Sequence, residues 1–488
     1  MKLSDLNTIL PIVLLVVWAC MLLLVDLFIP RRSKGWTALL AAVGLAAALG
    51  LTLAYAGRES TGFCDPNNPG NCMVVLDGFS SFLGSLFLAS GLFAIAIAYG
   101  YLKRMGLERG EYYTLILFSI SGMLLMAQAA DLIVVFLALE LLSIPLYVLA
   151  AFARPRTDSE EAGVKYFLLG AFATGFVVYG ITLVFGATNA TSLSGIAAAV
   201  AAGSFTKYLL LIGVALILVG FSFKVAAVPF HMWTPDVYQG APSSVTGFMA
   251  VGAKAAGFAA LLRIFITAFP SLNLDLVPVL WGLAALTMVV GNVIAISQTN
   301  IKRLLAYSSI AHAGYILMAF VAFGNPAVAS DAAASALFYL VTYAVTSFGA
   351  WAVVIALEKT DGKGLEISDF AGLGRKRPLL AAAMTIFMLS LTGMPPTLGL
   401  VGKFYLFRTA VEGGFIGLAV IGVLTSLISA YYYLRVVVTM YMREGDPTTE
   451  HEPWLDLTWG LTALATVILS FLPMALFTWA SGAVLKLF

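Results

Sequence analysis

The chain has 488 residues, of which 61% are hydrophobic and only 11% are charged, and its formal net charge is +2. So apolar a composition excludes a soluble fold and is typical of an all-α polytopic membrane protein. The sequence contains no Rossmann glycine fingerprint, phosphate loop, CxxC metal pair or haem attachment motif. We therefore expect this chain to hold no redox cofactor, nucleotide or metal, and to bind the lipid bilayer rather than nucleic acid.

Apolar runs long enough to cross a bilayer divide the chain. A transmembrane helix needs roughly 20 apolar residues to cross about 30 Å of hydrocarbon. Polar or Gly/Pro-rich breaks separate fourteen such runs, which predict spans at 8–29, 36–56, 78–101, 112–129, 131–152, 162–186, 207–227, 243–268, 277–297, 304–323, 332–357, 379–410, 414–442 and 457–483.

The basic residues of the loops predict the orientation of these spans, because lysine and arginine are retained on the cytoplasmic side. Most of them fall in the loops after odd-numbered spans, whereas the opposite face has Lys2, Arg58, Lys207 and Lys486. Both termini are therefore predicted to lie outside, on the periplasmic side of a prokaryotic plasma (inner) membrane.

Two of the three cysteines, Cys64 and Cys72, bracket the sequence DPNNPGN in a loop that this topology places outside. A disulfide persists in such a compartment. Two free thiols are an equal alternative on the sequence alone. We predict a bridge between them.

Four charged side chains lie inside stretches otherwise suited only to lipid: Glu140, Lys224, Lys254 and Lys403. A charge at bilayer depth costs at least about 2.5 to 3.5 kcal/mol on insertion scales, so such residues usually mark an ion or proton path. The four residues therefore predict a transporter of charge.

Glu140 and Lys254 lie too deep in their spans for their side chains to reach water. A buried carboxyl must be neutral, paired or hydrated, so Glu140 is suited to changing charge together with a neighbouring lysine. Small residues flank Lys254 and leave room for close packing or internal water. Purely structural roles in packing are the alternative for both.

Prolines accompany the other two lysines. Pro229 follows Lys224, and Pro395 and Pro396 precede Lys403 in a run longer than one crossing requires. Proline removes a backbone donor and breaks a helix, and broken helices at membrane depth line polar cavities that bind ions. We expect the seventh and twelfth spans to be discontinuous, with interfacial lysines as the alternative.

His312 lies in the tenth span, where a histidine is suited to passing protons. With Lys302 and Tyr307 it forms a candidate relay, and a core histidine bonded to a carbonyl is an equal alternative. Lys165 lies near a span end, where anchoring at the interface is the default interpretation.

The segments FKVAAVPFHMWTPDVYQGAP at 223–242 and QTNIKRLLAYSSIAHAGY at 298–315 resemble a known family. They are similar to signatures of the antiporter-like subunits of proton-pumping NADH:quinone oxidoreductase, respiratory complex I, a family shared with multisubunit sodium/proton antiporters. The resemblance covers essentially the full length. The wording HMWTPDVYQGAP and the GKFYLF ending resemble the subunit N branch, since M-type chains carry Glu where Lys403 stands.

This resemblance implies about 14 transmembrane helices with two inverted five-helix repeats and broken seventh and twelfth helices. The repeats cover spans 4–8 and spans 9–13. The expected segments are an N-terminal three-helix segment over 1–111, a first repeat over 112–268, a second repeat over 277–442 and a C-terminal helix over 457–488.

The resemblance also implies roles for the site residues. Glu140 and Lys224 are expected to be the charge pair of a first half-channel, Lys254 the central connector and Lys403 the proton site of the second half-channel. Lys165 and His312 match accessory positions.

The resemblance further implies a non-redox subunit of a translocase. Its partners are neighbouring antiporter-like and small membrane subunits, and FMN, iron–sulfur clusters and quinone are expected in partner subunits. The alternative is a stand-alone or Mrp-type cation/proton antiporter subunit. A sodium site needs several oxygen ligands, and the sequence shows no intramembrane Asp/Glu cluster beyond Glu140.

Overall fold

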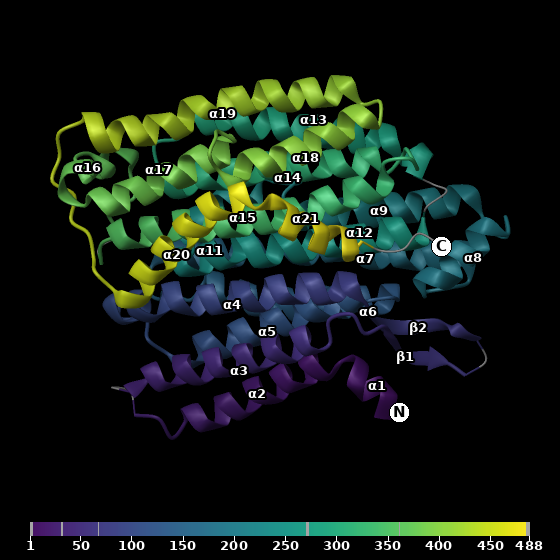
Figure 1. The fold of residues 1–488 in the computed structure, drawn as a ribbon. Helices are drawn as coiled ribbons and strands as arrows, with labels where there is room; N and C mark the ends of the chain where they lie inside the picture. Colours follow the sequence, from purple (N-terminus) through teal and green to yellow (C-terminus); the bar gives the residue numbers. More distant parts are fainter. Residues whose placement is uncertain (1–2, 31–32, 67, 270–272, 361, 485–488) are drawn as a thin grey trace.

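The computed structural model describes residues 3–30, 33–66, 68–269, 273–360 and 362–484. Its helices lie side by side in one elongated bundle (Figure 1). Four basic residues that enter the orientation argument, Lys2, Arg31, Arg32 and Lys486, lie outside the described residues, as does the end of the segment expected at 457–488.

The first half of the chain contains α1 (Leu3–Thr8), α2 (Leu10–Asp26), α3 (Gly35–Ala54), β1 (Ser60–Asp65), β2 (Asn68–Leu76), α4 (Gly78–Arg104), α5 (Gly110–Gln128), α6 (Leu132–Ala150), α7 (Thr157–Thr188), α8 (Leu193–Ala201), α9 (Lys207–Val225), α10 (Trp233–Gly240), α11 (Ser243–Phe248), the π-helical turn η2 (Met249–Ala253) and α12 (Lys254–Ala268). The second half contains α13 (Asn273–Ile296), α14 (Ile301–Ala322), α15 (Ala329–Leu357), the 3-10 turn η3 (Ile367–Phe370), α16 (Leu373–Lys376), α17 (Pro378–Thr392), α18 (Leu398–Glu412), α19 (Ile416–Met442), α20 (Pro453–Phe471) and α21 (Pro473–Gly482).

The all-α polytopic fold class is confirmed. In the described part of the chain, 12 helical stretches are long and apolar enough to cross a membrane. The two remaining expected spans, at 8–29 and 379–410, contain the shorter apolar helices α2 and α17. The total of fourteen spans and the inverted repeats stay predictions.

The expected single helix at 457–483 is wrong, because the chain divides it at Leu472 into α20 and α21. Pro473 follows this residue and has no backbone N–H with which to continue the helix. The sequence also did not predict the short helix α8, whose residues are too few to cross a bilayer.

The loop between α3 and α4 forms a β-hairpin that the sequence did not predict. Strands β1 and β2 pair antiparallel, and their register places Cys64 opposite Cys72. The two cysteines form a disulfide, so the predicted bridge is confirmed. Cys20 is free and exposed on α2.

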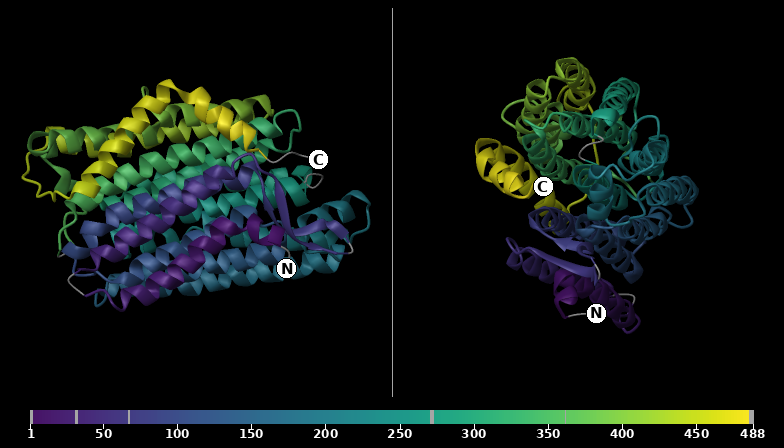
Figure 2. Two further views of the ribbon diagram at one scale, coloured as in Figure 1. Left: turned by 60° about the horizontal axis from the view of Figure 1, so that its bottom comes forward. Right: turned by 90° about the vertical axis from the view of Figure 1, so that its right-hand side faces the viewer.

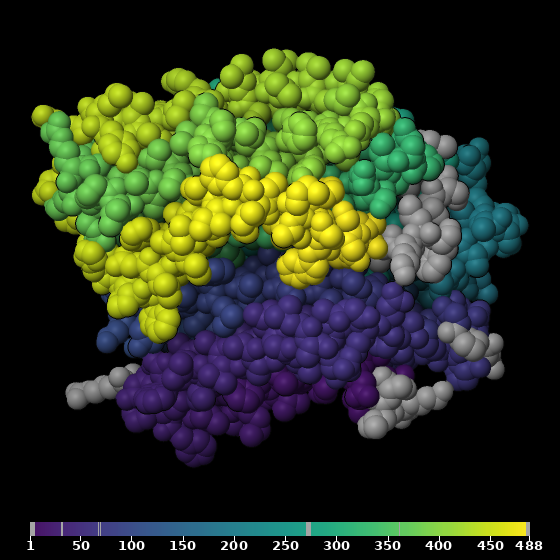
Figure 3. Space-filling view, in the orientation of Figure 1, coloured from purple at the N-terminus to yellow at the C-terminus, as the bar shows by residue number. Residues whose placement is uncertain are grey.

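The helices divide into a buried centre and an outer layer that faces lipid. The apolar parts of the stretch from α11 to α12 and of helix α14 consist of buried residues, whereas most residues in the apolar parts of α3, α7 and α20 are not buried. Helices α20 and α21 lie on the flank of the bundle (Figure 2), where they contact α15. In Figure 3 they form a yellow band between the purple N-terminal helices and the green helices of the second half.

A buried ion pair fastens α4 to the centre. The Arg263 guanidinium on α12 donates two hydrogen bonds, both of 2.9 Å, to the two carboxylate oxygens of Asp77. Asp77 also caps α4, because its side chain accepts from the backbone N–H of Ser80 at 2.8 Å. The arginine side chain is only 5% exposed and lies over the Phe79 ring, so both partners depend on the pair to stay satisfied.

We expect Arg263→Ala to destabilise the protein by about 3–5 kcal/mol, because it leaves the Asp77 carboxylate without its partner. The measurement is thermal unfolding of the detergent-solubilised chain, followed by fluorescence-detected size exclusion. Lys207→Ala is the matched control, since Lys207 and Asp275 form an exposed pair at 3.8 Å that contributes little. Equal melting temperatures for the two variants would contradict a stabilising role of the Arg263–Asp77 ion pair.

Candidate functional site

The predicted break in the seventh span is confirmed. Helix α9 ends at Val225, and Ala226 then takes a left-handed conformation with φ of 63°. The chain continues through Pro229 before α10 starts at Trp233. The Trp233 indole N–H donates at 2.9 Å to the carbonyl of Phe223 in the last turn of α9, which also accepts from the Ala226 N–H.

Lys224 lies in the last turn of α9 and is 5% exposed. Its amine donates to the hydroxyl of Ser143 on α6 at 2.8 Å and to the hydroxyl of Tyr166 on α7 at 3.2 Å. These two hydroxyl partners were not predicted from the sequence. Ser143 is three residues after Glu140 on α6, so the two side chains are neighbours on one face of that helix. The amine of Lys224 therefore lies at the helix face that also carries Glu140.

Glu140, the expected partner of Lys224, accepts a hydrogen bond of 2.8 Å from the Thr174 hydroxyl on α7. The ion pairs found among the described residues do not include Glu140 with Lys224. The structure therefore brings the two residues to the same helix face, with Ser143 bonded to the amine. Whether they act as a charge pair stays a proposal.

The predicted break in the twelfth span is also confirmed. Its prolines leave carbonyl oxygens that can bind a cation, and we call this group of oxygens the seat. Helix α17 ends at Thr392, where Gly393 has a φ of 88°. Within a helix the carbonyls of Leu391 and Thr392 would accept from the residues four positions later. Those residues are Pro395 and Pro396, which have no N–H, so both carbonyls are left free.

Lys403 on α18 fills this seat. Its amine donates to the carbonyls of Leu391 at 3.0 Å and Thr392 at 2.8 Å, and to the Ser426 hydroxyl on α19 at 2.7 Å. The C-terminal end of a helix carries partial negative charge and favours a cation there. Lys403 is 2% exposed, so this arrangement binds the amine in the interior of the bundle.

Lys254 lies in the centre and follows directly after the π-helical turn η2. Its amine donates to the carbonyl of Ser309 on α14 at 2.6 Å and to the hydroxyl of the same residue. Such π-helical turns inside α-helices are frequent at functional sites. Lys254 is 3% exposed and is therefore held by a single residue of the neighbouring helix.

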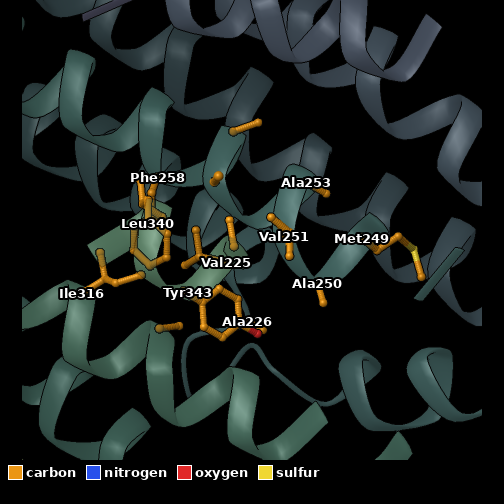
Figure 4. Close-up of a cluster of buried hydrophobic side chains, with 14 of the residues drawn as sticks. Val225, Ala226, Met249, Ala250, Val251, Ala253, Phe258, Ile316, Leu340 and Tyr343 are labelled. Carbon is orange, nitrogen blue, oxygen red and sulfur yellow. The ribbon is translucent and has the colours of Figure 1, made fainter. Parts of the chain in front are cut away.

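The surroundings of η2 are apolar. Figure 4 shows Met249 and Val251 from this turn gathered in one cluster with Val225 and Ala226 from the end of α9. Gly257 on α12 allows this close approach, because a Cβ atom there would lie 3.3 Å from the Lys224 side chain. The helix that carries Lys254 thus packs directly on the stem of Lys224.

A row of polar side chains on α14 continues from Lys254 toward Lys403. Ser309, His312 and Tyr315 are spaced three residues apart, and Ser308 is four residues before His312, so these side chains lie on one side of the helix. His312 lies between two tyrosine hydroxyls, of Tyr339 at 2.6 Å from Nδ1 and of Tyr433 at 3.2 Å from Nε2.

The two ends of this row reach the neighbouring groups. The Tyr433 hydroxyl also hydrogen-bonds Ser308, next to the serine that holds Lys254. The Tyr315 ring lies 4.6 Å from the Lys403 amine and 5.7 Å from the His312 ring. The structure therefore brings His312 between Lys254 and Lys403, and its accessory role stays a prediction.

The hydrogen-bond partners of His312 are not Lys302 and Tyr307, and the relay that joins these three residues stays a prediction. Lys302 is ten residues earlier on α14, and its amine donates instead to the carbonyl of Ala241 at 2.6 Å. The actual hydroxyl partners come from α15 and α19, which are distant in sequence, so the spacing along α14 gives no indication of them. The polar row itself is visible in the sequence as SSIAHAGY.

Lys165 lies apart from this central group. It is 40% exposed and pairs with Glu161 at 2.7 Å and with Asp236 at 2.8 Å. Asp236 also bonds Arg303 at 2.8 Å. The structure therefore places Lys165 in a partly exposed ionic network, and not beside the three buried amines.

We expect the substitutions Lys254→Met and Lys403→Met to affect stability in opposite ways. Removing the Lys254 amine relieves the cost of burying it, because the Ser309 carbonyl also has its helical partner, so stability should stay the same or rise. Lys403→Met leaves the Leu391 carbonyl without a donor, which should cost about 1–3 kcal/mol. Thermal unfolding of the purified variants measures both, and a stabilised Lys403→Met variant would contradict this account of the seat.

The family model described as the transmembrane part of NADH:quinone oxidoreductase and Mrp antiporters matches residues 129–429. The match covers more than half of the chain, and the chain belongs to this family.

Curated relatives give a more particular likeness. The chain is 49% identical over 465 residues to NADH-quinone oxidoreductase subunit N of Trichlorobacter lovleyi, covering 95% of this chain and 92% of that protein. It is 47% identical over 479 residues to the protein of the same name from Chloroflexus aggregans, covering 97% and 96%.

Solved structures share the fold over nearly the whole chain. A chain of respiratory complex I from Thermus thermophilus with bound aureothin matches with a TM-score of 0.81 and 36% identity, covering 97% of this chain and 100% of that chain. A chain of the Mrp complex from Dietzia sp. DQ12-45-1b matches with a TM-score of 0.87 and 20% identity, covering 100% and 98%. The second likeness concerns the fold alone.

Proposed function

We propose that this chain is subunit N, a proton-translocating membrane subunit of an NADH:quinone oxidoreductase, driven by quinone reduction in partner subunits. The observation that carries the proposal is the row of polar groups from Lys254 through Ser309, His312 and Tyr315 to Lys403 inside an otherwise apolar bundle. The names of the similar proteins support the assignment.

In this mechanism each buried amine holds a proton against neutral oxygen atoms. Lys224 rests on two hydroxyls, Lys254 on Ser309, and Lys403 on free helix carbonyls. A proton on an amine is stabilised by these oxygens without a fixed counter-charge, so a modest change nearby decides whether it stays or moves on. Hydroxyls and the His312 ring both accept and donate hydrogen bonds, so they are able to pass a proton between amines.

Glu140 is the group that provides such a change. Two unit charges 4 Å apart interact by about 4 kcal/mol at an effective dielectric of 20, so a small shift of Glu140 relative to Lys224 alters how firmly the amine holds its proton. The membrane potential opposes transfer by about 2.3 kcal/mol per charge for each 100 mV. The electrostatic change is therefore large enough to move a proton against it.

The energy is supplied outside this chain in our proposal. FMN, iron–sulfur clusters and the quinone lie in partner subunits, and this chain acts as the non-redox part of the enzyme. Lys165, with Asp236 and Arg303, is accessory to the first half of the path. We retain the segments 1–111, 112–268, 277–442 and 457–488 as the proposed organisation, with two inverted repeats.

The orientation follows from the distribution of basic residues. Helix α16, which carries Arg375 and Lys376, lies at one end of the bundle, and α1 and the β-hairpin lie at the other (Figure 1). Basic loops stay on the cytoplasmic side. We therefore place the chain in a prokaryotic plasma membrane with both termini on the periplasmic side.

We expect Glu140→Ala, Lys224→Ala and Lys403→Ala each to lower proton pumping by about a hundredfold or more, the scale of a lost proton-transfer group. The coupled NADH:quinone reductase rate should fall with it, whereas reduction of ferricyanide by NADH should not change. The measurement is acidification of inverted membrane vesicles. Arg408→Ala, in an exposed pair with Glu412 at 2.8 Å, is the control. Unchanged proton pumping in all three variants would defeat the proposal.

The Mrp-type cation/proton antiporter is the second candidate, because the fold is shared with a chain of an Mrp complex. A sodium site needs several oxygen ligands. Within the described residues, no group of three or more His, Cys, Asp or Glu side chains lies together. The purified chain in proteoliposomes should therefore show no sodium-dependent proton exchange, and such exchange would favour this second candidate.

A further inference from the structure

A second group of buried charges lies at the end of the bundle that carries the basic loops, away from the three amines. At its centre is Glu358, which follows the last residue of α15 and whose side chain is completely buried. Its Oε1 atom accepts from the Tyr101 hydroxyl on α4 at 3.3 Å and lies 3.8 Å from the Arg156 guanidinium. Its Oε2 atom has no hydrogen-bond partner.

This carboxylate is one side chain away from solvent. Arg156 is 31% exposed, and another of its nitrogens bonds Asp158, which is 58% exposed, at 3.1 Å. Arg156 therefore separates Glu358 from the surface as a long, partly solvated side chain. A proton that enters here meets Glu358 as the first buried carboxylate.

Toward the interior, the Tyr101 hydroxyl connects Glu358 to the start of the helix that carries Lys254. It accepts from the backbone N–H of Ser243 at 3.2 Å, and Ser243 is the first residue of α11. The Ser243 hydroxyl is buried and also lacks a partner. Buried polar atoms are almost always hydrogen-bonded to protein or to internal water. Glu358 Oε2 and Ser243 Oγ both lack a partner, and both residues bond the Tyr101 hydroxyl. We therefore expect internal water beside this hydroxyl.

Lys302 extends the group along α14. It is completely buried and lies near Glu358, Arg156 and Asp158. Ser309 is seven residues later, which is two helical turns or about 10 Å along the same face. Ser309 is the residue that holds the Lys254 amine.

Tyr238 spans the space between these two positions. It lies one turn before Ala241, whose carbonyl accepts from Lys302, and its side chain lies near Ser309. The polar groups thus continue from Glu358 and Lys302 to Lys254, independently of Lys224.

We propose that Glu358 is a proton-entry residue that supplies Lys254 from the basic end of the bundle. The carboxylate takes a proton from water beside Arg156, forming an O–H bond. That bond breaks when the proton passes, through water at Tyr101 and Ser243, to an uncharged Lys302 amine and on toward Ser309. No electron is transferred. This inference rests on the proposed function and adds an entry that bypasses Lys224.

A purely structural role would also bring α4, α7 and α15 together at Glu358. Glutamine separates the two roles, because its amide oxygen still accepts from Tyr101 but the side chain no longer takes up a proton. We therefore test Glu358→Gln and Glu358→Asp in membranes that contain the complete enzyme. Proton pumping and coupled quinone reduction should fall about a hundredfold in Glu358→Gln and recover in Glu358→Asp, with NADH:ferricyanide reduction unchanged.

Glu452→Gln is the matched control. Glu452 lies at the same end, pairs with Arg104 at 3.0 Å and also has an unpartnered Oε2 atom. It precedes α20 on the flank of the bundle, and its side chain is hydrogen-bonded to Arg104 rather than to Tyr101, Ser243 or Lys302. Pumping in this variant should match the unmodified enzyme, and an equal loss in both Gln variants would overturn the assignment of Glu358.

Lys254→Ala, measured in parallel, distinguishes the two proposals. If it stops pumping while Glu358→Gln pumps normally, the entry assignment is wrong and the proposed function stands. If both pump normally, the proposed function is wrong. Should Glu358→Gln fail to assemble on native gels, Tyr101→Phe removes the hydroxyl but keeps the ring. Normal pumping in that assembled variant would overturn the entry path, and a severalfold loss would support it.

Discussion

The structure depends on how the amines of Lys224, Lys254 and Lys403 are accommodated in an apolar interior, where none of them forms an ion pair with a carboxylate in the described residues. A buried ammonium group is costly unless oxygen atoms replace its water. The helix breaks provide some of these oxygens, because prolines leave carbonyls with no helical donor. Hydroxyls of Ser143, Tyr166, Ser309 and Ser426 provide the others. Every lysine that the sequence places at mid-depth is therefore solvated by the protein itself.

Helix α14 organises the centre of the molecule. It is enclosed on all sides, and one of its faces carries the serines, the histidine and the tyrosine that join Lys254 to Lys403. Its N-terminal end carries Lys302, which is bonded to the Ala241 carbonyl and lies near Glu358. A single helix thus connects the polar groups around Lys254, Lys403 and Glu358.

Much of this arrangement was predictable from the sequence. The apolar runs predicted the helices, and Pro229, Pro395 and Pro396 predicted both breaks, because a missing N–H is a local property that no tertiary contact restores. The four buried charges were found for the same reason, since a lysine deep in an apolar run has no route to water. The disulfide followed from two cysteines in one short loop.

The partners of these residues were not predictable in the same way. Tyr339 and Tyr433 meet His312 from helices far away in sequence, and Thr174 holds Glu140 although a lysine was expected there. Glu358 escaped notice because it stands in a polar loop segment, where a charged residue is ordinary. Its complete burial is produced by the packing of α4 and α15, which no local pattern reports.

The seat of Lys403 has one more consequence. Two of its three oxygens belong to the main chain of α17, so replacing the side chains of Leu391 or Thr392 leaves those acceptors in place. The binding of the amine is instead encoded several residues away, at the two imino acids that cannot close the last helical turn. The side chains at 391 and 392 can thus change during evolution while the carbonyls still bind the Lys403 amine, provided that the prolines at 395 and 396 are kept.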